Sequence, residues 1–262
     1  DSPRDGAVYL FDLSDPSPNE TAKLFPFDVL QPAQFGFDVA IEGDTLIASG
    51  DGVLKTSPGF EGGAAYRYDL GDEPPTEVEV LRGDDFADVD GFGAALDLED
   101  GIALIGAFGE DSGVDREGAA YLIDTRLDPG EAGRRQRLVA DGLGPAAFFG
   151  EAVALDDGLA LIGAPSFDGP GAAYVFDALT GRQLARIDAP NSAEEQDFGF
   201  EVALSGNLAL ISILGRVLPS RDRAPRAVYV YRIEQPARIP LPAPALLLVG
   251  AMGALVLVRR RR

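Results

Sequence analysis

The chain of 262 residues contains no histidine, no cysteine and no tryptophan. Ser-His-Asp and Cys-His nucleophiles, His/Cys zinc sites and disulfides all need these residues, so the composition excludes them. Basic residues are also scarce: 22 Lys and Arg stand against 43 Asp and Glu, which gives a net charge of −21. Such a surface repels phosphate backbones, so we expect no nucleic-acid partner.

Turn-forming and apolar residues are plentiful. The sequence has 32 Gly and 19 Pro, and 46% of its residues are hydrophobic, which is enough for a sizeable core. Before the last 28 residues, no window has a helical period. These features predict an all-β protein with many turns.

Two short signatures recur along the chain. Phe-Gly pairs begin at four positions, spaced 57, 57 and 49 residues apart: Phe35-Gly36, Phe92-Gly93, Phe149-Gly150 and Phe198-Gly199. An apolar run follows each pair, and then a second signature of the type Gly-Ala-Ala-Tyr, which begins at Gly63, Gly118, Gly171 and, as Arg-Ala-Val-Tyr, at Arg226. The chain opens on the second signature, at Gly6, so we expect it to start partway through a repeat.

Each unit reads as four short strands. In the third unit these are 151–155, 159–164, 172–176 and 183–187, separated by turn residues such as Asp157-Gly158. Radially repeated four-stranded antiparallel sheets of this length are typical of a β-propeller. The alternative is a parallel β-helix, whose rungs are usually shorter.

Residues 1–234 resemble the bacterial FG-GAP repeat family. The closest correspondence is Phe149-Gly150 followed by Gly163-Ala164-Pro165; the other units keep the Phe-Gly pair but not the Gly-Ala-Pro. The resemblance implies a β-propeller of about four to five blades here, as a partial ring or a small ring closed by the strands in 6–27. The repeated Phe is expected to pack between blades, and the repeated Gly to allow close approach of strands.

The same resemblance raises the question of calcium, because many such repeats carry an Asp-rich loop between the two signatures. Here the corresponding segments are hairpins too short to wrap an ion, so we expect no cofactor. The remaining candidate Ca²⁺ ligands are Asp88 and Asp90, in an acidic loop that also suits a plain connection into the next blade. A second candidate is the segment 110–115, which also suits an exposed hairpin tip.

The C-terminal segment differs from the repeats. Residues 235–243 read as a linker and sorting motif, and residues 244–262 as a single transmembrane helix with an arginine cluster. From Ile239 to Val258 there are 20 residues without a charge. The arginines are expected to stay on the cytoplasmic side, which would leave the propeller outside.

This segment resembles the PEP-CTERM class of sorting signals, in its VPLPA variant. The motif residues are Ile239, Pro240, Leu241, Pro242 and Ala243, and the terminal cluster is Arg259, Arg260, Arg261 and Arg262. The resemblance implies export, inner-membrane anchoring, cleavage by an exosortase-type protease, and a destination at the cell surface or in the extracellular matrix.

Together these observations predict an exported, non-catalytic binding or structural module. Its expected partners are exopolysaccharide or surface proteins, besides the processing protease and the membrane. A Ca²⁺-dependent adhesion propeller and a secreted carbohydrate-active enzyme with paired carboxylates are the alternatives.

Overall fold

The computed structural model describes residues 6–14, 16–26, 35–50, 63–83, 91–110, 116–166, 169–190, 197–214 and 227–234, and the backbone of 257–260. This part of the chain contains 18 strands and no helix, which confirms the all-β prediction. Four antiparallel sheets contain four strands each, and two further strands form a hairpin. We call the four-stranded sheets blades 1 to 4.

The strands follow chain order within every sheet. The hairpin consists of β1 (Val8–Asp12) and β2 (Asn19–Leu24). Blade 1 contains β3 (Phe35–Glu42), β4 (Thr45–Gly50), β5 (Ala64–Asp69) and β6 (Thr76–Leu81). Blade 2 contains β7 (Phe92–Glu99), β8 (Ile102–Ala107), β9 (Ala119–Asp124) and β10 (Arg135–Leu138). Blade 3 contains β11 (Val153–Asp156), β12 (Leu159–Ala164), β13 (Ala172–Asp177) and β14 (Gln183–Asp188). Blade 4 contains β15 (Phe198–Ser205), β16 (Leu208–Ile213), β17 (Ala227–Glu234) and β18 (Leu257–Arg260).

Tight turns join the first two strands of each blade. In blade 2 the turn residues Asp100 and Gly101 both have positive φ, of 50° and 70°, and Asp157 and Gly158 repeat this in blade 3. Asp-Gly is a preferred sequence for two-residue hairpin turns in which both residues are left-handed, because the twist of such a turn matches the twist of the strands that it joins. The sequence therefore sets the register of these hairpins locally.

The hydrophobic core lies between successive sheets. One cluster joins blades 1 and 2, another joins blades 2 and 3, and a third joins blades 3 and 4. The second strand of blade 3, β12, is buried along its whole length because it has a sheet on each side. Strands buried on both faces read as continuous apolar runs, which explains the run that follows each Phe-Gly pair.

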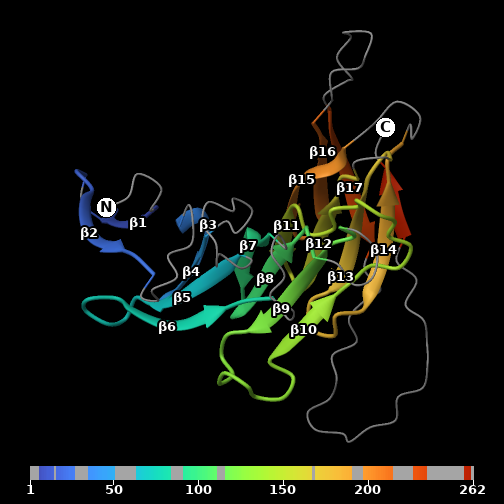
Figure 1. The fold of residues 1–262 in the computed structure, drawn as a ribbon. Helices are drawn as coiled ribbons and strands as arrows, with labels where there is room; N and C mark the ends of the chain where they lie inside the picture. Colours follow the sequence, from blue (N-terminus) through green and yellow to red (C-terminus); the bar gives the residue numbers. More distant parts are fainter. Residues whose placement is uncertain are drawn as a thin grey trace, which may run out of the picture.

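The sheets follow one another as an open arc, with the β1–β2 hairpin at one end and blade 4 at the other (Figure 1). The hairpin packs its Val8 and Leu24 against Phe35 and Tyr66 of blade 1. Because the hairpin and blade 4 stand at opposite ends of the arc, the hairpin does not close a small ring, and that alternative is wrong for the described residues. The antiparallel order also excludes a parallel β-helix.

The C-terminal segment departs from its prediction in one place. Leu257–Arg260 form the strand β18, which pairs antiparallel with β17 and completes blade 4, so these four residues are not helical. A run of Val and Leu fits a pleated strand as well as a helix, and β17 offers it a backbone edge. Residues 235–256 and 261–262, which include the predicted sorting motif and most of the predicted helix, lie outside the described residues. Within the residues that are described, no helix is long and apolar enough to cross a membrane.

Candidate functional site

The signature phenylalanines lie inside the structure, between blades. The four side chains are between 0% and 3% exposed: Phe35, Phe92, Phe149 and Phe198. Each packs against an aromatic ring of its own blade; the centroids of Phe149 and Tyr174, for example, are 5.5 Å apart with the rings edge-on. Edge-on pairs of this kind add to the stabilisation from burial. These residues hold the blades together and do not form an accessible site.

The signature glycines meet where adjacent blades touch. Gly150 has a φ of +96°, and a Cβ there would lie 2.2 Å from the carbonyl oxygen of Ala119 in blade 2. A Cβ on Gly163 would lie 2.0 Å from the carbonyl oxygen of Gly199 in blade 4. Glycine is needed at these positions because only it allows so close a backbone approach. Ala164, next to Gly163, is buried in the cluster between blades 2 and 3.

Carboxylates at one repeated position cap the hairpin of the following blade. Glu42 lies seven residues after Phe35, and its two oxygens accept hydrogen bonds from the N–H groups of Asp100 and Gly101, both at 2.8 Å. Glu99 occupies the same position in blade 2 and accepts from the Asp157 N–H at 3.1 Å. Asp156 occupies it in blade 3 and accepts from the Gly206 N–H.

A second row of carboxylates joins the first strands of adjacent blades. Asp38 accepts a hydrogen bond from the Leu96 N–H at 2.7 Å, and Asp97 accepts one from the Leu155 N–H at 2.6 Å. Charge-assisted bonds of this length are stronger than neutral ones. The acidic residues beside the hairpins therefore hold one blade to the next.

Burial makes some of these carboxylates costly to ionise. Loss of hydration raises the pKa of Asp38, an effect that the N–H donors of Leu96 and Val39 oppose and that the charge of Asp97 reinforces. Loss of hydration also raises the pKa of Glu99, with a further contribution from its neighbour Asp156. Hydrogen bonds to amides lower a carboxyl pKa, so burial outweighs them here.

These contacts bear on whether the hairpin segments can bind calcium. A calcium loop needs several carboxylates that converge on one ion. Glu42, Glu99 and Asp156 instead reach across to amides of three different turns, so the hairpin segments do not fit the ion. In the described ranges there is no group of three or more carboxylates placed to hold a metal. The candidate ligands Asp88 and Asp90 lie outside the described residues.

Glu110, the first residue of the other candidate calcium segment, is not at an exposed tip. It is 1% exposed and accepts a hydrogen bond from the Tyr121 hydroxyl at 2.6 Å. Its second oxygen accepts from Nε of Arg137 at 2.5 Å, which makes a salt bridge between β10 and the segment that follows β8. The prediction of an exposed tip is wrong for this residue, because a paired charge can be buried where an unpaired one cannot. Residues 111–115 lie outside the described residues.

One cavity lies on the face where the Phe-Gly strands begin. Its volume is about 280 Å³, and it lies between the loops of blades 2, 3 and 4. The lining residues lie beside a Phe-Gly pair or just after the second strand of a blade: Phe108, Phe148, Glu151, Pro165, Ser166, Asp197, Phe200 and Leu214. Phe108, Pro165 and Leu214 each directly follow the second strand of their blade, and Pro165 is also the last residue of the Gly163-Ala164-Pro165 motif. The Ser166 N–H donates to the Ala147 carbonyl at 3.1 Å and fixes one wall.

The backbone at this cavity is unusual. Three of its residues have left-handed φ values, 54° at Phe148, 54° at Ser166 and 63° at Asp197. Phe148 and Asp197 directly precede the Phe-Gly pairs of blades 3 and 4, and in blade 2 the same position is Gly91, also with positive φ. Glycine adopts this conformation without strain, whereas a large side chain does not. The phenylalanine at 148 is therefore retained at a conformational cost.

The cavity combines aromatic and acidic groups. The rings of Phe108 and Phe148 lie 6.0 Å apart between centroids and are inclined by 51°. Glu151, Asp197 and Ser166 line the same space. An apolar recess with a few polar groups is the usual construction of a small-ligand site, and the volume of this one lies just below the usual range of roughly 300–1,000 Å³.

Sequence reasoning identified the repeated signatures but not this cavity. Four of its residues flank the Phe-Gly pairs of blades 3 and 4, and the signal that would have indicated them is Phe148 and Asp197 at a position where blade 2 has glycine. The sorting-motif residues 239–243 and the arginines 261 and 262 lie outside the described residues, while Arg259 and Arg260 lie in β18.

Comparison with known proteins supports the repeat assignment in part of the chain. A family model described as FG-GAP repeat matches residues 75–123 and 133–176. Each match begins at the outer strand of one blade and continues through the first three strands of the next. A search among curated proteins finds no significant match. The chain therefore contains FG-GAP repeats in these two segments, folded as four-stranded antiparallel blades.

Proposed function

We propose that this protein is a non-catalytic binding module whose ligand enters the cavity beside the Phe-Gly loops. The observation that carries the proposal is Phe148, which keeps an aromatic side chain at a left-handed position and packs against Phe108. Strained residues that the surroundings hold in place cluster at functional sites. A repeat domain of propeller-like blades is consistent with a binding role.

The lining favours a neutral or cationic sugar unit of a matrix polysaccharide. The apolar face of a sugar ring can pack on Phe108 and Phe148, while Glu151 and Asp197 can accept hydrogen bonds from hydroxyl or ammonium groups. The net charge of −21 repels an acidic polymer, so an anionic polysaccharide is disfavoured.

Binding of oligosaccharides to the full chain tests this proposal. Calorimetry with oligomers of glucosamine, glucose and galacturonate should show binding of one of the first two and none of the third. Phe148→Gly should abolish binding without unfolding the protein, because glycine suits the backbone conformation there. Phe37→Ala, at an exposed aromatic residue of β3, is the matched control and should bind as the wild type does. Unchanged binding by Phe148→Gly would overturn the proposal.

A hydrolytic enzyme is the second candidate, because Glu151 and Asp197 line one cavity. Glycoside hydrolysis uses two carboxyl groups on opposite sides of the scissile bond. Incubation of the same oligosaccharides with wild type, Glu151→Gln and Asp197→Asn separates the two roles. Release of shorter sugars by the wild type alone would favour the enzyme; intact oligosaccharides in all three samples favour the binding module.

We further propose that the protein is exported and processed at its C-terminus. The support is the order of the proline motif 239–243, the apolar run 244–258 and Arg259–Arg262 in the sequence. Carrying these arginines across a membrane is unfavourable, so they should hold the C-terminus in the cytoplasm. Membrane insertion would require residues 257–260 to leave the edge of β17.

Mass spectrometry of the mature protein from its native host tests this second proposal. We expect peptides up to about Arg238 and none from Leu246–Val258. Replacement of Arg259–Arg262 by glutamate should leave unprocessed chain. Recovery of the intact C-terminus from the mature protein would show that no cleavage occurs, and normal maturation of the glutamate variant would show that the arginines are not recognised.

A further inference from the structure

The cavity of the proposed binding site is rich in hydrogen-bond acceptors and poor in donors. The polar residues that line it are Glu151, Asp197 and Ser166, and none of the described residues that line it is basic. An ionised carboxylate only accepts hydrogen bonds, so of these three side chains only that of Ser166 can donate. The backbone N–H of Ser166 is already used, since it donates to the Ala147 carbonyl. The lining therefore suits a ligand group that donates hydrogen bonds and accepts few.

Aromatic rings supply much of the apolar lining. Phe108 and Phe148 lie 6.0 Å apart between ring centroids, and Phe200 lines the same cavity. The ring of Phe108 lies against the backbone of blade 2, because a Cβ on Gly91 would be 2.7 Å from its Cε1 atom. The faces of aromatic rings carry partial negative charge, which attracts cations. Aromatic and acidic residues in one recess therefore favour the same kind of ligand, a cation.

Burial strengthens the attraction of this cavity for positive charge. Asp197 is 3% exposed, and opposite charges attract more strongly at a buried site than in water because the effective dielectric constant is lower. Glu151 and the three phenylalanines are partly exposed, so a ligand can reach them from solvent. The net charge of −21 attracts cations to the molecule over a longer range.

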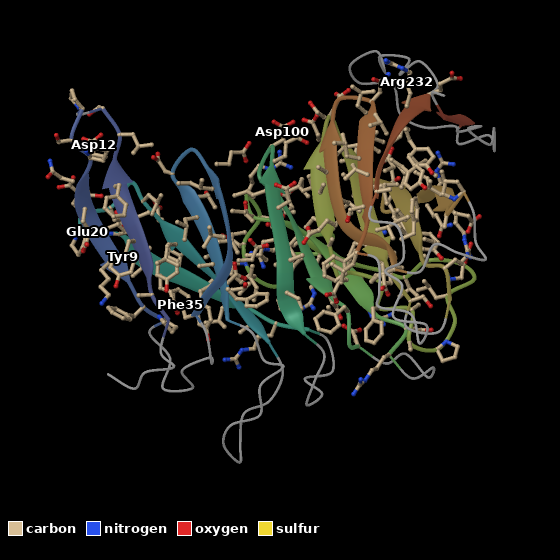
Figure 2. All side chains as sticks on the ribbon, turned by 90° about the horizontal axis from the view of Figure 1, so that it is seen from above. Tyr9, Asp12, Glu20, Phe35, Asp100 and Arg232 are labelled. Atoms are coloured by element: carbon tan, nitrogen blue, oxygen red, sulfur yellow. The ribbon has the colours of Figure 1, made fainter. Side chains whose placement is uncertain are left out.

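The capping carboxylates do not belong to this cavity. Glu42, Glu99 and Asp156 lie beside the turns that join the first two strands of each blade, at the end of the strands opposite to the Phe-Gly pairs. Figure 2 shows the two ends of the blades: Phe35 lies at one end and Asp100 at the other. A cation that followed the net charge alone would bind at either end, whereas one that recognises the cavity binds only beside the Phe-Gly pairs.

We propose that the cavity binds a sugar unit that carries a free ammonium group, as in a deacetylated amino sugar. The inference rests on the proposed binding function and narrows its ligand from neutral or cationic sugars to cationic ones. An ammonium group has three N–H donors and no acceptor, which complements Glu151 and Asp197. The rings of Phe108 and Phe148 attract its charge and offer apolar contact to the face of the sugar ring.

A neutral sugar and a lysine side chain fit this lining less well. Sugar hydroxyl groups accept as well as donate, and only Ser166 can serve them as a side-chain donor. N-acetylation of an amino sugar removes the charge and adds an acceptor oxygen. A lysine side chain carries the charge, but it has no ring face to cover the phenylalanines and it loses rotamer freedom on binding.

Calorimetry on the full chain with trimers of glucosamine, N-acetylglucosamine and glucose tests the inference. The glucosamine trimer should bind at one site per chain, and roughly tenfold or more tightly than the other two, because a hydrogen bond to a charged group contributes about this much. Glu151→Gln and Asp197→Asn should weaken its binding by a similar factor. Asparagine tolerates the left-handed backbone at position 197, so this variant should keep the local fold. Phe108→Leu keeps an apolar side chain without the ring and should weaken binding roughly threefold.

Asp100→Asn is the matched control for charge. It removes one negative charge at the opposite end of the blades, and Asn-Gly suits that turn as well as Asp-Gly does. This variant should bind the glucosamine trimer as the wild type does. Equal weakening by Asp100→Asn and Glu151→Gln would show that binding follows the net charge and not the cavity, and would overturn the inference.

The remaining outcomes separate this inference from the proposed function. Binding of the glucose or N-acetylglucosamine trimer as tight as that of the glucosamine trimer would overturn the ammonium group and leave the binding function standing. A trilysine peptide that binds more tightly than the glucosamine trimer, and that Glu151→Gln weakens, would overturn the inference in favour of a protein partner. Absence of binding by all three trimers would overturn the inference and the proposed function together.

Discussion

Blades 3 and 4 carry matching residues in very different surroundings. Leu161 and Val175 of blade 3 are 0% exposed, whereas Leu210 and Val230 at the same repeat positions of blade 4 are 38% and 46% exposed. Both blades use the same strand order and the same Phe-Gly start. The difference is that, among the described residues, blade 3 has a sheet on each side and blade 4 has one on a single side. Burial of a repeated residue therefore depends on its neighbouring blade and not on its own type.

Removal of a signature phenylalanine should have the largest effect. Phe149→Ala should lower the free energy of unfolding by about 3–5 kcal/mol, because it leaves a cavity between blades 2 and 3. Urea unfolding followed by circular dichroism measures this loss. Val230→Ala, on the uncovered face of blade 4, is the matched control and should change stability by less than about 0.5 kcal/mol. Similar losses from both variants would show that the two blades are equally covered in solution.

Removal of an inter-blade carboxylate should have an intermediate effect. Asp97→Ala takes the acceptor from the Leu155 N–H and should cost about 1 kcal/mol, the lower end of the range for an unsatisfied amide, because the contact is only partly buried. Ser205→Asp places a carboxylate at the capping position of blade 4, where the described residues offer no following turn, and should leave stability unchanged. A clear stabilisation by Ser205→Asp would show that blade 4 has a partner.

The pH dependence of stability should show a smaller effect. The folded structure raises the pKa of Asp38 and Glu99 through burial, so the folded state binds more protons than the unfolded state above about pH 4. Their contribution to stability is therefore present below that pH and is lost as the pH rises through the raised values. Asp38→Asn has no such charge, so its stability relative to wild type should improve between about pH 4 and about pH 7. A constant difference across this interval would contradict the burial argument.

Calcium should have the smallest effect. Millimolar Ca²⁺ should raise the melting temperature only slightly, through screening of the negative surface. A specific site at 100 times its Kd would instead add about 2.7 kcal/mol and a clear shift. The variants Asp88→Ala and Asp90→Ala test for a specific site. If Ca²⁺ but not Mg²⁺ clearly raises the melting temperature, and either variant abolishes that rise, the result would favour the Ca²⁺-dependent adhesion propeller.

Local sequence patterns determined much of this fold. The spacing of the Phe-Gly pairs, the apolar runs after them and turns such as Asp157-Gly158 predict four-stranded antiparallel blades without reference to the rest of the chain. These features depend on residues that are close in sequence, because side-chain alternation and turn conformation are local properties. The same patterns could not show that Leu257–Arg260 pair with β17, since a Val- and Leu-rich run suits a strand or a helix.

Only the tertiary structure decided which acidic and apolar residues act between blades. Glu42 and the turn that it caps are 58 and 59 residues apart in sequence, and Glu110 is buried only because Arg137 and Tyr121 reach it from other strands. Whether Phe148 lines a cavity and whether Tyr9 is exposed depends on which blade packs beside each residue. The sequence by itself determined the blade, because its strands and turns follow local periodicity; packing determined the sites, because each lies between segments that only the folded arc brings together.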